Sequence, residues 1–170
     1  MSTTWLTKVA RVAWRAARLI VVEPRDAVLS ARMALWVVLV SVVARLTSLP
    51  RAHRIASVDV RSRPSAAADV PLRLARTIDR LLSLDLLVFR RNCWRRAMVL
   101  NRYLALHGLE TRINFGLQRD AGGRMQGHAW LEYEGQPLLE SNASAYVVTF
   151  SLPLEPAGVT ADQRRQRARC

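Results

Sequence analysis

The sequence predicts an α+β fold in which a helix that begins with a cysteine packs on a small antiparallel sheet, with further helices before it. Apolar residues recur at helical spacing in the first half of the chain and again over residues 93–107. From residue 111 onward they alternate along short segments separated by glycine-containing turns, a pattern typical of strands. The change of period falls at Gly108, a residue type that commonly ends helices.

Two helices are expected before residue 48. The first covers roughly residues 5–22, where Lys8 and three arginines form one stripe and apolar residues lie on another side. Glu23-Pro24 ends it, because the residue before a proline avoids helical angles, and Pro24 suits the first turn of a second helix over about 25–47. The longest charge-free apolar run is 33–44, which arginines bound. Since a membrane span needs about 20 such residues, we expect a buried or interfacial helix.

The middle of the chain is expected to hold a linker and a third helix. Residues 51–68 contain a proline, three serines and an alanine run, and predict a linker with a short extended piece at 55–60. A helix is expected over 69–82, with Asp69 as its cap and Pro71 in its first turn. The chain then divides into an N-terminal helical segment and linker (1–68), a core (69–152) and a flexible tail (153–170).

The helix that carries the cysteine has clear boundaries. Asn92 is a favourable N-cap for residues 93–107, CWRRAMVLNRYLALH, and Gly108 is a left-handed C-terminal cap. Strands are expected at 111–118, 127–133 and 136–141, with a fourth at 147–152. The turns between the first three strands are RDAGGR and the Glu134-Gly135 pair.

The formal net charge of +13 is distributed unevenly. The basic excess lies in residues 1–96 and 162–170, whereas residues 97–161 carry four basic and six acidic residues. No zinc-finger spacing, RNA-binding strand motif or helix-turn-helix accompanies the excess, so nucleic-acid binding is not expected. Two cysteines make no disulfide framework and the N-terminus has no secretory pattern, which predicts a reducing, cytoplasmic compartment.

Cys93 stands in the first turn of its helix, where unpaired N–H groups and the helix dipole stabilise a thiolate. Four arginines close in sequence favour the anion further, namely Arg90, Arg91, Arg95 and Arg96. The backbone N–H of Cys93 is expected to face a developing oxyanion. The alternative is a buried cysteine with only a packing role, but an arginine-flanked helix start is an unusual place for one.

His128 is the candidate base on the second strand. An imidazole base needs an acceptor that fixes its tautomer. Glu140, across the following hairpin turn, is expected near the start of the strand that carries His128. Glu132 is the competing carboxylate, but it lies about 13 Å along the strand from His128. The other histidines need no catalytic explanation, because His53 is expected in the linker and His107 in the last helical turn.

Together these motifs resemble the transglutaminase-like (papain-like) thiol hydrolases, and most of all the leader peptidases of lasso-peptide biosynthesis, the B proteins. The matching residues are Cys93 with its helix, Gly108-Leu109-Glu110, Ile113–Gly116, His128–Glu132 (HAWLE) and Gly135. The chain departs from the family at the third catalytic position, which is usually Asp and here is Glu140. The extra methylene moves the carboxylate by more than an ångström unless the backbone compensates. The N-terminal part also lacks the winged-helix pattern of members with a fused leader-binding domain.

The resemblance implies a cysteine peptidase that removes the leader from a ribosomally made precursor peptide. Cys93 would be the nucleophile, His128 the general base and acid, Glu140 the orienter, and the backbone of Cys93 part of the oxyanion site. It implies no cofactor and no metal. The implied partners are the precursor peptide, a separate leader-binding protein and a lasso cyclase.

Two other interpretations stay open from the sequence. The same three residues could transfer an acyl group to an amine instead of water, as transglutaminase-like enzymes do. The basic amphipathic segment over 5–22 would also suit a non-catalytic protein that binds a leader peptide or contacts a membrane peripherally. Products formed with an added amine, and binding to liposomes, separate these interpretations.

Overall fold

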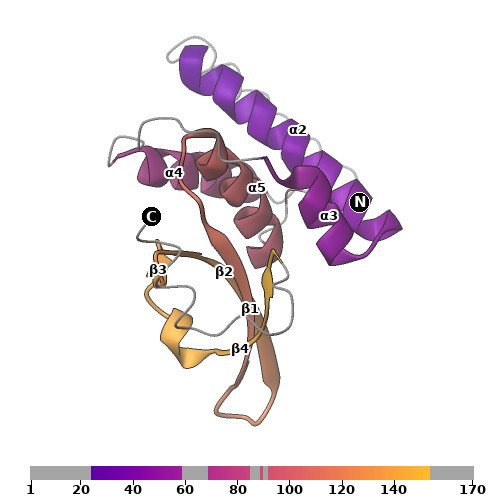
Figure 1. The fold of residues 1–170 in the computed structure, drawn as a ribbon, viewed down its shortest axis with the longest axis vertical. Coiled ribbons are helices and arrows are strands. Elements are labelled where there is room, and N and C mark those ends of the chain that lie inside the picture. The colour runs from indigo at the N-terminus through magenta and orange to yellow at the C-terminus, as the bar shows by residue number, and fades with distance from the viewer. Residues whose placement is uncertain (1–23, 59–68, 85–88, 90–91, 154–170) are drawn as a thin grey trace, which may run out of the picture.

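The computed structural model describes residues 24–58, 69–84, 89 and 92–153, drawn in colour in Figure 1. Within them, helices precede one small antiparallel sheet, so the α+β class expected from the sequence is confirmed. The helices are α2 (Pro24–Leu46), α3 (Leu49–Ala56), α4 (Val70–Leu82) and α5 (Cys93–Leu106). The strands are β1 (Arg112–Arg119), β2 (Met125–Tyr133), β3 (Gln136–Leu138) and β4 (Val147–Leu152). The helix expected over 5–22 and the tail beyond residue 153 lie outside the described residues.

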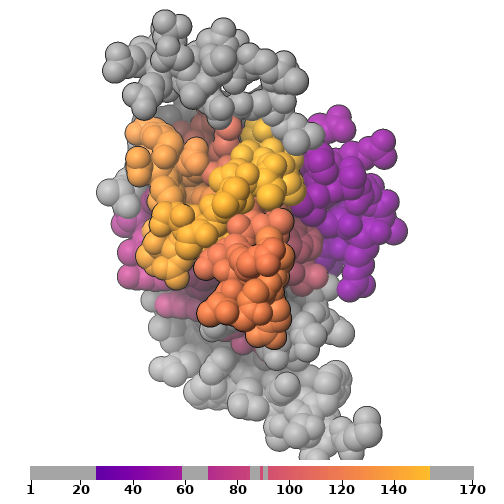
Figure 2. Space-filling model, turned by 90° about the horizontal axis from the view of Figure 1, so that it is seen from below, coloured from indigo at the N-terminus to yellow at the C-terminus, as the bar shows by residue number. Residues whose placement is uncertain are grey.

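The sheet has the strand order β3-β2-β1-β4, and all its pairings are antiparallel. In the β1–β2 hairpin, Gly116 pairs with His128 and Phe115 with Ala129. Glu134 and Gly135 both have positive φ, 49° and 78°, as a tight two-residue hairpin turn requires. The strand expected at 136–141 is shorter than predicted and ends at Leu138. The β1–β2 hairpin extends away from the helices in Figure 1 and towards the viewer in Figure 2.

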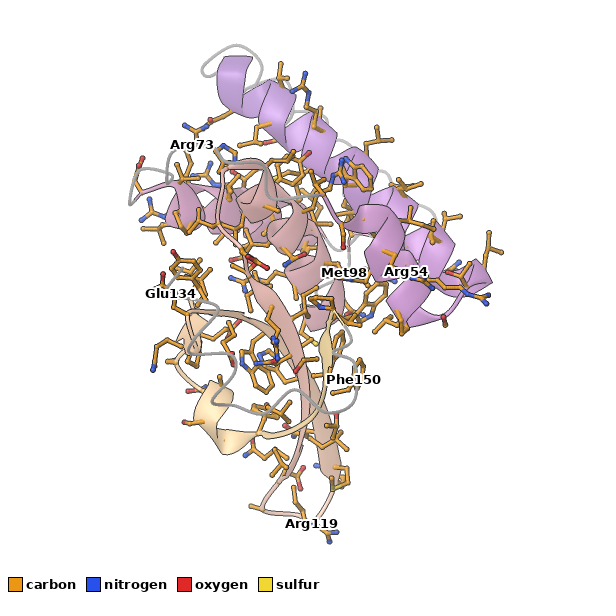
Figure 3. The ribbon with its side chains drawn as sticks, viewed as in Figure 1. Arg54, Arg73, Met98, Arg119, Glu134 and Phe150 are labelled. Atoms are coloured by element: carbon orange, nitrogen blue, oxygen red, sulfur yellow. The ribbon has the colours of Figure 1, made fainter. Side chains whose placement is uncertain are left out.

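α5 lies at the centre of the molecule, between the sheet and the other helices. Asn92 caps it by accepting a hydrogen bond from Trp94 N at 3.2 Å, and Gly108 follows it with φ 82°, both as predicted. Met98 is fully buried where α5 meets the sheet (Figure 3). The same core takes in side chains from α2 and α4 on one side and from three strands on the other: Met33, Val37, Leu74, Ile78, Ile113, Leu131 and Leu152. The division at residue 68 stays a prediction, although α2 and α3 contribute to this common core.

α3 corrects the prediction of a linker with an extended piece at 55–60. Ser48-Leu49-Pro50 ends α2 and also begins α3, because Pro50 falls in the first turn of the new helix, where its missing N–H is not needed. The buried face of α3 consists of Ala52, His53 and Ala56. Two alanines and a histidine carry little apolar signal, so the helix was not visible in the sequence. His53 is therefore a buried helical residue and not a linker residue.

Arg102 of α5 connects α2 and α3 to the core. Its guanidinium lies over the ring of Trp36 in α2, 3.6 Å from the centroid, and its Nη1 donates a hydrogen bond to the carbonyl of Ala56 at 2.8 Å. Burial lowers the pKa of Arg102 from its usual value. The contact thus combines a cation–π interaction with satisfaction of the last turn of α3.

α2 is long and apolar enough to cross a membrane by length and composition alone, over Asp26–Leu46. Met33 and Val37 nonetheless lie fully buried in the core of the domain. One side of the helix therefore belongs to the folded core. Only 22% of its most apolar 18-residue window is buried, so much of its remaining surface is apolar.

Candidate active site

The structure places Cys93 at the first residue of α5, as the sequence predicted. Its thiol is free and half-buried, and it packs against the edge of the core. The Asn92 side chain accepts a hydrogen bond from the backbone N–H of Trp94. The first-turn N–H groups next to Cys93 have no partner inside the helix, because an α-helix leaves its first four donors unpaired. These donors can stabilise an oxyanion that forms beside the thiol.

His128 and Glu140 meet beside β2. The distance from His128 Nε2 to Glu140 Oε2 is 3.6 Å, which is an ion-pair distance and longer than a hydrogen bond. Both side chains are largely shielded from water, with 24% and 21% of their surfaces exposed. The neighbouring Leu139 has φ 59°, so the chain bends sharply between the end of β3 and Glu140. This bend sets the direction in which the Glu140 side chain leaves the backbone.

The competing carboxylate, Glu132, is engaged elsewhere. Its Oε2 accepts a hydrogen bond from Asn114 Nδ2 at 2.7 Å, and Asn114 Oδ1 accepts one from Ser151 Oγ at 2.6 Å. This chain of bonds crosses three neighbouring strands and satisfies the buried amide of Asn114. Among the described carboxylates, Glu140 is therefore the one beside His128.

Arg96 connects the cysteine helix to this pair. Its Nη1 lies 3.0 Å from Glu140 Oε1, and its Nε lies 2.7 Å from Asp79 Oδ1 in α4. Arg96 stands three residues after Cys93 and so shares its side of α5. The sequence analysis expected Arg96 to favour the Cys93 thiolate, which stays a prediction; the structure adds that its guanidinium pairs with two carboxylates. Its spacing from Cys93 is the signal that could have assigned it to the site.

Arg95, also expected near the thiol, has its own contacts in the structure. Arg95 lies over the ring of its neighbour Trp94, 5.2 Å from the centroid. Burial, and then the charge of Arg45, lower the pKa of Arg95 from its usual value. Arg95 is therefore oriented towards α2, while Arg90 and Arg91 lie outside the described residues.

Of the three predicted residues, the structure brings His128 and Glu140 into direct contact. Glu140 touches His128 directly and reaches α5 through Arg96. Within the described part of the chain, no hydrogen bond joins the thiol of Cys93 to the ring of His128. Catalytic contacts are often long in an enzyme without substrate and tighten when it binds.

Aromatic rings support His128 on its face of the sheet. The ring of Trp130 is nearly parallel to it, with 6.0 Å between the centroids, and Tyr146 lies 5.1 Å away at an angle of 36°. Gly116, opposite His128 in β1, makes room for this cluster, because a Cβ there would come within 2.9 Å of the Trp130 ring and of the Val147 carbonyl. Sequence reasoning missed Tyr146, since a single tyrosine before a strand carries no signal of its own.

The groups present suit acyl-transfer chemistry: a thiol at a helix start, and an imidazole held by a carboxylate. In the described residues, no group of three or more His, Cys, Asp or Glu side chains could hold a metal ion.

One of three comparisons with known proteins found a match. No curated protein and no solved structure matches the chain. A family model described as the transglutaminase-like superfamily matches residues 36–151, which run from within α2 to within β4. The match covers more than half of the sequence, including the helix of Cys93, the strand of His128 and Glu140. The chain belongs to the transglutaminase-like superfamily.

Proposed function

We propose that this chain is a cysteine peptidase that removes the leader from a ribosomally synthesised precursor peptide during lasso-peptide maturation. The superfamily includes cysteine-dependent peptidases and acyltransferases. One observation carries the proposal further: the Glu140 carboxylate is held against the His128 ring by Arg96, which projects from the same side of α5 as Cys93. The HAWLE strand and the cysteine helix that resemble the lasso leader peptidases supply the substrate class.

The carboxylate assigns roles to the two ring nitrogens of His128. Nε2 faces Glu140, so Nε2 carries the proton of the neutral ring and Nδ1 is the acceptor for the thiol proton of Cys93. The carboxylate also stabilises the imidazolium that forms when Nδ1 takes up that proton. Arg96, which is itself paired with Asp79, holds the carboxylate in place.

Peptide cleavage then proceeds in two stages. The Cys93 thiolate attacks the scissile carbonyl carbon, and the backbone N–H of Cys93 donates to the resulting oxyanion. The imidazolium returns its proton to the nitrogen of the leaving amine, so that the C–N bond breaks and a thioester remains on the enzyme. A water molecule, deprotonated by His128, attacks the thioester and releases the leader acid and the free thiol.

The proposed partners follow from the product. The liberated core peptide has a new α-amine, which a lasso cyclase would join to a side-chain carboxylate to close the ring. A separate small leader-binding protein would present the leader to the site. We place the reaction in the cytoplasm, where the thiol stays reduced.

Mass analysis of a precursor peptide incubated with the chain, its leader-binding protein and the cyclase tests the proposal. Cys93→Ala is expected to abolish cleavage while its circular dichroism spectrum stays that of the wild type. Cys170→Ala, which removes the other thiol, serves as the matched control and is expected to cleave normally. Full cleavage by Cys93→Ala would refute the proposal. An added amine that appears in the leader product would instead favour the acyltransferase alternative.

A further inference from the structure

The outward side of α2 is an apolar surface that no described residue covers. Six large apolar side chains form it, each between 37% and 79% exposed: Val28, Leu35, Val38, Leu39, Val42 and Leu46. Val28, Leu35 and Val42 follow one another at seven-residue intervals, and seven residues are close to two helical turns. The exposed residues therefore form one continuous stripe, which we name the outer face of α2.

The opposite side of α2 fixes the orientation of the helix. Met33, Val37, Val40 and Ser41 are at most 2% exposed and face the core that α2 shares with α4 and α5. Arg102 adds its contact over Trp36. A helix that crossed a bilayer would have to leave these contacts. α2 instead lies along the outside of the helical layer (Figure 1), and among the described residues none lies over its outer face.

Arginines border the outer face. At about 100° per residue, exposed Arg32 lies about 60° to one side of Leu35 and exposed Arg45 about 80° to the other. Beyond the end of α2, Arg51 and Arg54 line a shallow hollow together with Thr47 and Ile55. Residues 24–56 contain five arginines and one acidic residue, a net charge of +4.

We propose that the outer face of α2 docks on an anionic lipid bilayer, with the apolar stripe in the acyl boundary and the arginines on lipid phosphates. Apolar residues at the centre and arginines at both margins are the arrangement of a helix that lies in the plane of a membrane surface. Arginine stems cover apolar surface while their guanidinium groups reach the phosphates. Charge selects this occupant over a second copy of the chain, because a copy would bring the same arginine-rich margins together.

Flotation of the full chain with vesicles tests the proposal. The chain is expected to float with vesicles of phosphatidylcholine mixed with phosphatidylglycerol and to remain behind with phosphatidylcholine alone. Leu35→Asn combined with Val42→Asn is expected to weaken binding at least tenfold. Arg51→Gln with Arg54→Gln should weaken it about fivefold per arginine, and added salt should weaken it in the wild type.

Matched variants at the far side of the molecule are the controls. Leu117→Asn with Val147→Asn removes two exposed apolar side chains from the sheet, and Arg119→Gln with Arg124→Gln removes two charges from the hairpin tip. Both pairs are expected to bind like the wild type. If the hairpin arginines matter as much as Arg51 and Arg54, net charge alone drives binding and the proposal fails.

Three further results would also overturn the proposal. The first is floated protein that resists alkaline extraction, which indicates a spanning helix. The second is a dimer, detected by light scattering, that dissociates when Leu35 and Val42 are substituted, while vesicle binding persists. The third is unchanged flotation of the Leu46→Gln variant. Leu46 is 79% exposed, so this substitution is expected to leave the fold intact and tests the outer face even if the double variant does not fold. Peptidase activity does not enter any of these measurements, so their outcome is independent of the proposed function.

Discussion

Glu140→Gln removes the negative charge beside His128 and keeps the shape of the side chain. Two unit charges 3.6 Å apart, the separation of His128 Nε2 and Glu140 Oε2, attract by about 1.2 kcal/mol at the permittivity of water and about 4.6 kcal/mol at an effective value of about 20. About a quarter of each side chain is exposed, so the interaction falls between these limits. The His128 imidazolium forms during the reaction. Because Glu140→Gln removes the attraction that stabilises it, kcat/KM should fall by about tenfold to a thousandfold.

Leader cleavage, followed by mass analysis of precursor and product over time, measures this effect. Glu132→Gln is the matched control, because it makes the same change on the strand of His128 but at a carboxylate that accepts its bond from Asn114, which glutamine can also accept. Arg96→Gln should lower kcat/KM by less than Glu140→Gln, and the double variant by little more than Glu140→Gln alone, since Arg96 acts through Glu140. A Glu140→Gln enzyme within twofold of the wild type, beside a strongly impaired Glu132→Gln enzyme, would refute the assignment.

Three other predictions concern stability, the backbone and pH. Gly116→Ala should lower the free energy of unfolding by about 1–3 kcal/mol in urea denaturation, because the added Cβ meets the Trp130 ring and a carbonyl at 2.9 Å. Leu139→Gly should keep cleavage near the wild-type rate, whereas Leu139→Ile should slow it, because a β-branched residue resists φ 59° and displaces Glu140. Burial lowers the pKa of His53 from 6.5, so stability should be complete above that pH and fall below it as the unfolded chain takes up the proton. The fall should be smaller in His53→Gln, and equal pH profiles of thermal unfolding would contradict the burial argument.

Local rules account for most of the elements that the sequence predicted correctly. A proline after a glutamate, an asparagine before a helix, and glycines with positive φ set backbone angles through their own chemistry, wherever they stand in the fold. The boundaries at Pro24, Asn92, Gly108 and Glu134-Gly135 follow from such rules and agree with the structure. The alternation of β2 similarly placed His128 and Trp130 on one face.

Elements that depend on long-range packing could not be predicted in this way. α3 has eight residues, which is too short for a stable isolated helix, and it exists because Ala52, His53 and Ala56 pack against the core. Side-chain partners have the same limit. Arg96 pairs with residues 17 positions before it and 44 after it, and no local pattern predicts those distances along the chain.

The sequence by itself determined the fold class, the helix start that carries Cys93 and the strand that carries His128, because backbone preferences and apolar periodicity act over a few neighbouring residues. Only the tertiary structure decided which carboxylate lies beside the histidine, which arginine positions it and which side of α2 faces the core. Those outcomes depend on the packing of elements remote in sequence, where a bend at one residue such as Leu139 changes which charged groups come within a few ångströms.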